Sequence, residues 1–340
     1  MPAPLPQPLP TRPALDALLA RYPLRATRVQ LVAQLDCEIH RITLARPHGL
    51  ASLAPEADVV LRIYPAIRSA VAPIAAELRW LQAMAQAGLH VPQPLADEQG
   101  QTLQRWQPDA RGPARHAVLL SWLPGRMLDR GLRPVHLRRV GELVARMHHC
   151  AEGLVAAGLM PQGQATDGPD LDRWAEGARA SDPRLPARTH AVLAAAAHQL
   201  RAARAGLGAG PAQRGWVHGD LHLWNLLFHG QQAGAIDFSD AGFGFHAQDL
   251  ASTLQYLRHP WVGNHGHGAR LPAMQAELLE GYARWRPLPH GVEQQIDLCV
   301  AIRMINTVEW MLDQWPRLTL RPWGPGFLAR VPGTLQAWAG

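Results

Sequence analysis

The side chains that could do chemistry gather between residues 216 and 240 of this 340-residue chain, which read WVHGDLHLWNLLFHGQQAGAIDFSD. Asp220 and Asn225 lie in one loop of the form His-x-Asp-x4-Asn, and Asp237 follows a short apolar run, 233–236, that predicts a strand. In this order, one carboxylate can accept a proton from a hydroxyl group, while an amide and a second carboxylate hold Mg²⁺ on a nucleotide. The spacing therefore favours phosphoryl transfer, with Asp220 as the catalytic base and Asn225 and Asp237 as metal ligands.

The composition excludes other routes to phosphate chemistry. All 33 basic residues are arginines, and the chain contains no lysine. A Walker A loop needs a lysine that binds phosphate, and Schiff-base chemistry needs a lysine amine, so neither can be built from this chain. Contacts with phosphate must come from arginine, from metal ions and from backbone amides.

Charge and cysteine usage indicate the kind of protein and its partners. The net charge of +6 is typical of arginine-rich coding rather than of a nucleic-acid-binding surface, because no dense basic run or basic helical stripe occurs. Cys37, Cys150 and Cys299 have neither zinc-ligand nor disulfide spacing, which indicates a reducing compartment. No stretch reaches the ~20 apolar residues of a membrane-spanning helix, and the N-terminus lacks the apolar core of a signal peptide. We expect a cytoplasmic monomer or homodimer that binds neither nucleic acid nor membrane.

The first third of the chain reads as a leader followed by a small sheet. Residues 1–24 are expected to form a flexible proline-rich leader and a short helix. Residues 25–122 predict one helix at 74–87 and a set of strands at 27–33, 38–44, 58–64, 101–106 and 117–122. This order predicts an antiparallel sheet with one packed helix, which we take as a nucleotide-binding N-lobe.

Beyond Leu123 the pattern becomes mainly helical. Residues 123–340 predict helices at 135–149, 170–180, 187–205, 248–258, 272–285 and 292–314. Together the two halves predict an α+β, bilobal fold in which the larger helical C-lobe carries the catalytic loop and the acceptor site.

The segment 216–240 resembles that of the aminoglycoside phosphotransferase and choline kinase-like family, which includes type II homoserine kinases and bacterial stress-response kinases. The likeness extends over roughly residues 25–315. It implies a protein kinase-like fold, ATP and Mg²⁺ as cofactors, and a hydroxyl group of a small molecule as acceptor. The resemblance also implies that His218 supports the catalytic loop and that Asp249, in the sequence Gln-Asp-Leu-Ala, is a carboxylate that braces it.

The resemblance assigns nucleotide contacts in the N-lobe. Arg62 stands where kinases usually place a lysine on the third strand, and Glu77 on the following helix matches its ion-pair partner. A guanidinium has five donors in a planar fork, so it can contact phosphate oxygens and Glu77 together. The backbone at Trp122 and Leu123 is expected to hold adenine. The loop between the first strands, 34–38, contains no glycine, so the phosphates are not covered by a glycine-rich loop.

The acceptor site is expected to lie beside Trp224 and Asp240 and on the last long predicted helix, where Arg303, Glu309 and Trp310 recur at helical spacing. From Ala241 to the end the chain has seven carboxylates against eight arginines, which gives no support for a polycationic acceptor. An amino alcohol, hydroxy amino acid, sugar or aminoglycoside-like molecule with a charged or zwitterionic part is expected.

Several other functions compete with this interpretation. A protein Ser/Thr kinase of the stress-response type remains an alternative, although the short segment from Asp237 to Asp249 leaves no long activation loop. A non-catalytic binding protein on a kinase scaffold is a second alternative, but it predicts loss of motif residues that are all present. His218-x-Asp220 also begins the triad of non-haem iron oxygenases, with His246 or His259 as the distal ligand, but those enzymes are double-sheet jelly rolls. The tract with His259, His265 and His267 is expected to be an exposed loop rather than a metal site.

Overall fold

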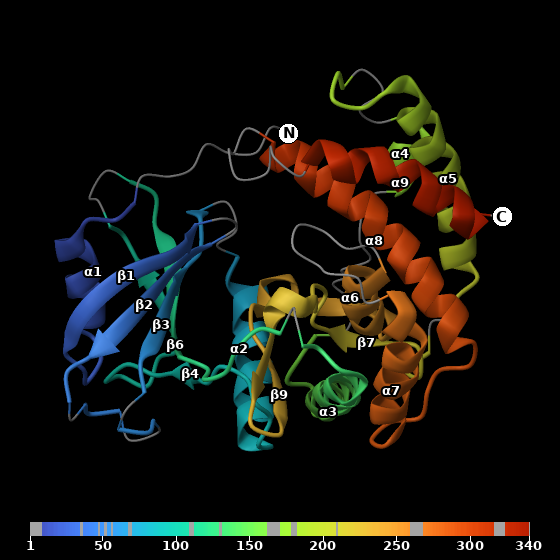
Figure 1. Ribbon diagram of the computed structural model, residues 1–340. Coiled ribbons are helices and arrows are strands. Elements are labelled where there is room, and N and C mark those ends of the chain that lie inside the picture. The colour runs from blue at the N-terminus through green and yellow to red at the C-terminus, as the bar shows by residue number, and fades with distance from the viewer. Residues whose placement is uncertain are drawn as a thin grey trace.

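The computed structural model describes residues 9–34, 37–46, 48–50, 53–55, 57–66, 70–108, 112–128, 131–161, 171–177, 182–208, 210–258, 268–315 and 324–339 (Figure 1). Most of the proline-rich leader, part of the loop 34–38 and the histidine tract around residue 265 therefore lie outside the described residues. In the described part of the chain, no helix is long and apolar enough to cross a membrane.

A single antiparallel sheet forms the N-terminal part, as the strand pattern predicts. Its six strands are ordered β1-β2-β3-β6-β4, and β5 also pairs with β6. The bounds are β1 Ala26–Gln34, β2 Glu38–Leu44, β3 Val59–Ile63, β4 Pro94–Leu95, β5 Leu103–Trp106 and β6 Arg115–Ser121. The two-residue strand β4 was not predicted, because so short a segment carries no alternation. One antiparallel layer followed by helices also differs from the double sheet of iron oxygenases.

The two faces of this sheet are covered by different helices (Figure 1). Helix α1, Arg12–Leu19, covers the outer face, where its leucines pack against Val59, Leu61 and Ile63 of β3. Helix α2, Val71–Gln86, lies on the inner side. Because successive strand side chains point to opposite faces, Arg62 projects to the side that α2 covers.

The C-terminal part is mainly helical. Its helices are α3 Pro134–Ala156, α4 Leu171–Ala175, α5 Ala187–Ala205, α6 Ala247–Arg258, α7 Leu271–Ala283, α8 Val292–Gln314 and α9 Gly324–Ala339. Helices α3 and α7 cross closely at Gly141, where an added Cβ would lie 2.0 Å from the carbonyl oxygen of Leu278. Helices α4, α5, α8 and α9 share a second core and stand apart from the sheet (Figure 1).

Two short antiparallel strand pairs lie between the sheet and the helices. Strand β7, Arg214–Val217, pairs with β10, Gly242–Phe245, and β8, Leu226–His229, pairs with β9, Gln232–Ala235. The sequence predicted β9, but no strand was predicted at β8 or β10. One continuous core joins these pairs to α2, α3, α6 and α7. Segment 216–240, the catalytic segment predicted from the sequence, is therefore built into the core of the molecule rather than attached to its surface.

Candidate active site

The hairpin of β8 and β9 brings the two predicted metal ligands together. Leu226 pairs with Ala235 at its open end, and the Ile236 amide donates to the Asn225 carbonyl at 2.9 Å. Asn225 directly precedes β8, and Asp237 follows β9 after Ile236. Asn225 and Asp237 thus lie at the same end of one hairpin.

The turn that carries Asp237 has an unusual backbone. Among the described residues, Asp237 is the only non-glycine residue with a positive φ, 64°. Aspartate tolerates this left-handed region better than most side chains. The following turn, Phe238–Asp240, is anchored by Phe238, whose ring meets that of Trp80 edge-on at 5.6 Å. The turn holds the Asp237 carboxylate half-exposed at the surface of the core.

The catalytic loop approaches this turn so closely that it requires a glycine. Gly219 has φ +82°, and a Cβ at this position would lie 2.4 Å from the Asp240 carbonyl oxygen. The neighbouring Asp220 is therefore carried next to the turn that begins with Asp237. Any larger residue at position 219 would push the loop away from the turn.

Asp249 holds the catalytic loop from below. Its fully buried carboxylate accepts the amides of His218 and Gly219, each at 2.9 Å, and contacts His148 Nε2 at 3.0 Å. Burial raises the pKa of the Asp249 carboxyl, but the hydrogen bonds from His148 and the His218 amide outweigh it and lower the pKa. An ionised Asp249 that accepts the His218 and Gly219 amides can hold the backbone of the loop in place, as a bracing carboxylate must.

Both ring nitrogens of His218 contact backbone. Nε2 donates to the Ile236 carbonyl at 3.0 Å, and Nδ1 accepts the Asp220 amide at 3.3 Å. Because both nitrogens are occupied and the residue is fully buried, this geometry suits a support of the loop better than a proton carrier.

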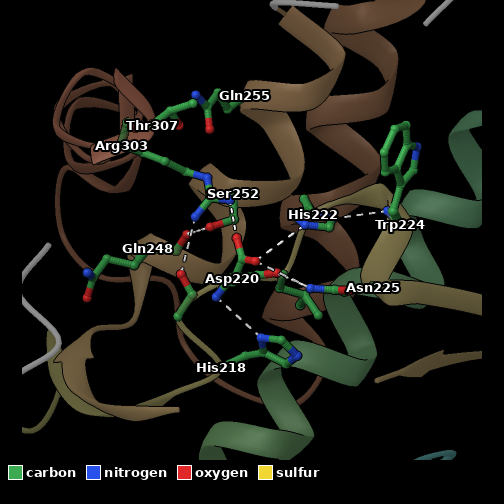
Figure 2. Close-up of polar contacts among 12 residues, drawn as sticks. His218, Asp220, His222, Trp224, Asn225, Gln248, Ser252, Gln255, Arg303 and Thr307 are labelled. Atoms are coloured by element: carbon green, nitrogen blue, oxygen red, sulfur yellow. Dashed lines mark hydrogen bonds and ion pairs between the residues drawn. The ribbon is translucent and has the colours of Figure 1, made fainter. Parts of the chain in front are cut away.

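The Asp220 carboxylate is engaged on both oxygens (Figure 2). Oδ1 pairs with Arg303 of α8, and Oδ2 lies 3.3 Å from His222 Nε2. Asn225 donates its Nδ2 to the Asp220 carbonyl oxygen at 2.9 Å. Burial raises the pKa of Asp220, but the charge of Arg303 and the interaction with His222 outweigh burial and lower the pKa, so this carboxylate is ionised at neutral pH. An ionised carboxylate is what a proton acceptor needs.

Arg62 connects the sheet to the hairpin. Its Nη1 donates to Glu77 of α2 at 2.6 Å, and its Nη2 lies 3.5 Å from Asp237 Oδ1. The Tyr64 hydroxyl donates to the other Glu77 oxygen at 3.1 Å. Burial alone would lower the pKa of Arg62. The nearby Glu77, Tyr64 and Asp237 outweigh burial and raise the pKa, so the guanidinium stays charged.

The side-chain oxygens of Asn225 and Asp237 fit a magnesium ion. The Asn225 amide nitrogen is used by Asp220, which leaves its Oδ1 without a protein partner in the described part of the chain. Asp237 Oδ1 accepts the Ser239 hydroxyl at 3.0 Å, and Oδ2 likewise has no described partner. Mg²⁺ prefers such hard oxygen ligands and takes its remaining ligands from water and phosphate, so one carboxylate and one amide suffice.

The two backbone amides predicted to contact adenine, at the end of β6, differ in their hydrogen bonding. The Trp122 amide donates to the Asp58 carbonyl at 3.0 Å, so the expectation that this amide binds adenine does not hold. The cause is strand pairing, since β3 and β6 continue their ladder for one bond beyond Ser121. The Leu123 amide has no hydrogen-bond partner among the described residues, and Arg41 covers the Trp122 ring at 4.2 Å. Leu123 therefore remains the candidate.

The predicted acceptor residues fall into two groups. Trp224 is 50% exposed beside the loop, and the exposed Asp240 lies in the adjoining turn. Arg303 contacts Asp220 directly. Glu309 instead faces α4, where Trp174 Nε1 donates to it at 3.4 Å, and Trp310 packs against the second core. Helical spacing predicted one shared face, but these two positions are turned towards α4 and the helical core.

Two residues beside Asp220 were missed by the sequence analysis. His222 accepts the Trp224 amide on Nδ1 at 3.2 Å, so its Nε2 carries the proton that points to Asp220. Tyr256 of α6 stacks on His222 at 4.8 Å, and burial raises its pKa to about 12. His222 could have been identified from the sequence, because it lies two residues after Asp220. Nothing in the local sequence marks Tyr256 as a neighbour of the site.

A separate cavity of about 1060 Å³ lies between α5, α8 and α9, where its walls include Leu207, His290, Gln294, Leu298 and Trp338. None of the predicted site residues lines it. The chemistry described above therefore belongs to the hairpin and the catalytic loop, not to this cavity.

Comparison with known sequences identifies relatives along most of the chain. Residues 49–288 match the model of the phosphotransferase enzyme family. A homoserine kinase from Gluconobacter oxydans (strain 621H) is 30% identical over 267 residues, which cover 76% of this chain and 79% of the relative. A homoserine kinase from Rhodopseudomonas palustris (strain ATCC BAA-98 / CGA009) is 29% identical over 67% of this chain and 66% of its own length.

Solved structures share the fold at low sequence identity. An amicoumacin kinase in complex with AMP-PNP, Ca²⁺ and Ami has a TM-score of 0.74 and 19% identity, over 95% of this chain and 92% of its own. A microcompartment-associated aminopropanol kinase has a TM-score of 0.68 and 21% identity, over 95% and 94%. The match to the family model, the relatives and the kinase-like α+β fold agree: the chain belongs to the phosphotransferase enzyme family and is a kinase that acts on a small-molecule hydroxyl group.

Proposed function

We propose that the enzyme transfers the γ-phosphoryl group of ATP, with Mg²⁺, to the hydroxyl group of a compact amino alcohol or hydroxy amino acid in the cytoplasm. The observation that carries this proposal is the convergence of Asp220, Asn225 and Asp237 at one end of the β8–β9 hairpin. A base, an amide ligand and a carboxylate ligand in this arrangement match the needs of phosphoryl transfer.

In the proposed reaction the acceptor hydroxyl oxygen forms a bond to the γ-phosphorus of ATP. The bond from that phosphorus to the β,γ-bridging oxygen breaks, ADP leaves with that electron pair, and the hydroxyl proton passes to Asp220. The ionised state of Asp220 supports its role as proton acceptor. Its side chain remains 29% exposed, so the carboxylate lies at a surface that an acceptor can approach.

The nucleotide would be held from both lobes. Leu123 offers a backbone amide to adenine, and Arg62 offers its fork to the phosphates while Glu77 fixes the guanidinium. Asn225 and Asp237 would hold the metal through their unoccupied oxygens. Mg²⁺ bound there neutralises phosphate charge that develops during transfer. The Arg62 contact with Asp237 would keep the phosphate-binding strand and the metal-binding turn in register.

A small, zwitterionic acceptor is supported by two observations. The two relatives reported above are named homoserine kinases, and homoserine is a hydroxy amino acid. The charged group nearest the proposed base is the cation of Arg303, which would repel a polycationic aminoglycoside. Neither observation favours a protein acceptor over a small molecule.

A screen of ATP consumption tests the proposal. Hydroxy amino acids, amino alcohols, sugars, aminoglycosides and a generic protein substrate would be offered with Mg-ATP. We expect turnover with a compact amino alcohol or hydroxy amino acid. Turnover only with the protein substrate would instead identify a Ser/Thr kinase. Absence of all turnover, together with no thermal shift on addition of Mg-ATP, would indicate a binding protein on a kinase scaffold.

A further inference from the structure

Arg303 covers one carboxylate oxygen of Asp220, Oδ1. The residue lies in the middle of α8, and its side chain is only 15% exposed. Its Nη2 pairs with Asp220 Oδ1, and its Nη1 donates to the Gly219 carbonyl at 3.3 Å (Figure 2). The guanidinium thus contacts both the base and the loop that carries it.

The second carboxylate oxygen of Asp220 is also engaged by neighbouring donors. His222 Nε2 lies 3.3 Å from Oδ2, and Asn225 Nδ2 lies 3.5 Å from the same atom. His222 is held by the stacked Tyr256 ring and by its bond to the Trp224 amide, so its position is fixed from two sides. A hydroxyl group must come within hydrogen-bond reach of one carboxylate oxygen to deliver its proton. Of the two neighbours, Arg303 has the long side chain that can turn away.

Arg303 also has an unused donor. Its Nε is buried and has no hydrogen-bond partner in the described part of the chain. A buried donor without a partner is costly, and a carboxylate that binds the guanidinium in bidentate fashion would satisfy it. A new anion in the site would compete with Asp220 for the same guanidinium.

We propose that Arg303 recognises an anionic group of the acceptor, a carboxylate, and that by turning to this group it uncovers Oδ1 of Asp220. This inference rests on the proposed function, because it needs Asp220 as the base. Acceptor binding and release of the base then become one event. Without an acceptor anion, Arg303 keeps Oδ1 covered, so water has poor access to the base and wasteful hydrolysis of ATP is suppressed.

A matched pair of acceptors tests this role. Homoserine and 3-aminopropan-1-ol share the amine and the primary hydroxyl and differ by the carboxylate. The kinetics of both would be measured with the parent enzyme, Arg303→Met and Arg303→Lys, and hydrolysis of Mg-ATP without acceptor would be measured in parallel. Arg258→Met is the control variant. It removes an arginine of α6 whose ion-pair partner, Asp297, lies on α8 before Arg303.

In the parent enzyme, kcat/KM should favour homoserine by about 100-fold, the size expected for a desolvated ion pair. Arg303→Met should reduce this preference to roughly threefold or less through loss on homoserine, and should raise hydrolysis without acceptor several-fold. Arg303→Lys should restore part of the preference, because it restores the charge without the fork. Arg258→Met should behave as the parent.

Different failures point to different errors. Equal use of both acceptors by the parent enzyme would overturn the role of Arg303 and leave the proposed function intact. An equal loss on both acceptors in Arg303→Met, with no rise in hydrolysis, would show that Arg303 only supports the loop. Failure of the parent to phosphorylate either compound would overturn both proposals.

Discussion

Arg62 of β3 lies 3.5 Å from the carboxylate of Asp237, at the turn that follows β9. The contact joins the sheet to the hairpin of the catalytic segment across a long separation in sequence. Glu77 and Trp80, on neighbouring turns of α2, explain it. Glu77 fixes Arg62, and Trp80 packs on Phe238 beside Asp237. Helix α2 therefore sets the distance between the proposed phosphate-binding arginine and the proposed metal ligand.

Replacing Arg62 tests whether charge or geometry matters there. Arg62→Lys keeps the charge but cannot contact Glu77 and phosphate with one planar fork. We expect kcat/KM to fall by about 10- to 100-fold, the effect of losing one charge-assisted hydrogen bond worth about 2 kcal/mol. Arg62→Met would leave Glu77 buried and unpaired, which costs about 3–5 kcal/mol of unfolding free energy.

A matched control separates stability from nucleotide contact. Arg286→Lys alters another buried arginine, which pairs with Glu152 among the C-terminal helices. This variant should change the denaturant midpoint without changing nucleotide affinity. Unchanged turnover in Arg62→Lys would contradict a role for the guanidinium geometry.

Asp237→Asn tests the metal ligand without disturbing the backbone. Asparagine also tolerates the positive φ of 64° at this position, whereas alanine would add strain of about 1–2 kcal/mol. Loss of the carboxylate charge should weaken binding of Mg-AMP-PNP at least about tenfold by calorimetry, because Mg²⁺ relies on few protein ligands. Binding of AMP-PNP without metal should change little. Equal Mg-AMP-PNP affinity in the variant and the parent would exclude Asp237 as a ligand.

The buried His246 predicts a loss of stability in mild acid. Burial lowers its pKa to about 2, with help from the nearby His148 and Arg286. Below about pH 6.5 the imidazole of His246 binds a proton in the unfolded chain but not in the folded chain. The contribution of His246 to the free energy of unfolding is therefore complete above pH 6.5 and is lost as the pH falls. By pH 5 the titration of His246 lowers the free energy of unfolding by about 2 kcal/mol.

Denaturant unfolding at pH 5, 6 and 7 measures this effect. His246→Gln should flatten the dependence of the unfolding free energy on pH by up to about one proton. His149→Gln, at an exposed position on α3, should keep the slope of the parent. A slope unaffected by His246→Gln would show that this residue does not titrate between the two states.

Much of the fold follows from periodicity and from the residues that end helices. Helices α5 and α8 agree with their predicted bounds, 187–205 and 292–314. Alanine or apolar residues recur at helical spacing in both, and proline or glycine residues mark where they begin or end. Helix α9 was missed because Pro332 and Gly333 oppose helix in the local sequence. Burial of Phe327, Leu328 and Val331 against the second core outweighs that preference.

The site was predictable where its parts are close in sequence. The motif order placed Asp220, Asn225 and Asp237 on a loop and a turn, and both are found at one hairpin. The partners from other elements were not predictable in detail. Spacing on α8 suggested a common face for Arg303 and Glu309, but only packing decides that Arg303 turns to Asp220 while Glu309 turns to α4. The Trp122 amide was misjudged for the same reason, since its partner Asp58 directly precedes another strand, β3.

The central claim is that Asp220 accepts the proton of a small hydroxyl acceptor during phosphoryl transfer. The most direct measurement compares the parent with Asp220→Asn, following the phosphorylated acceptor by phosphorus NMR with Mg-ATP and homoserine, and nucleotide binding by calorimetry. Asp220→Asn should lose at least about 100-fold in kcat, as expected for removal of a general base, while Mg-AMP-PNP affinity stays within about threefold. Phosphohomoserine formed at near-parental rates by Asp220→Asn would contradict the account.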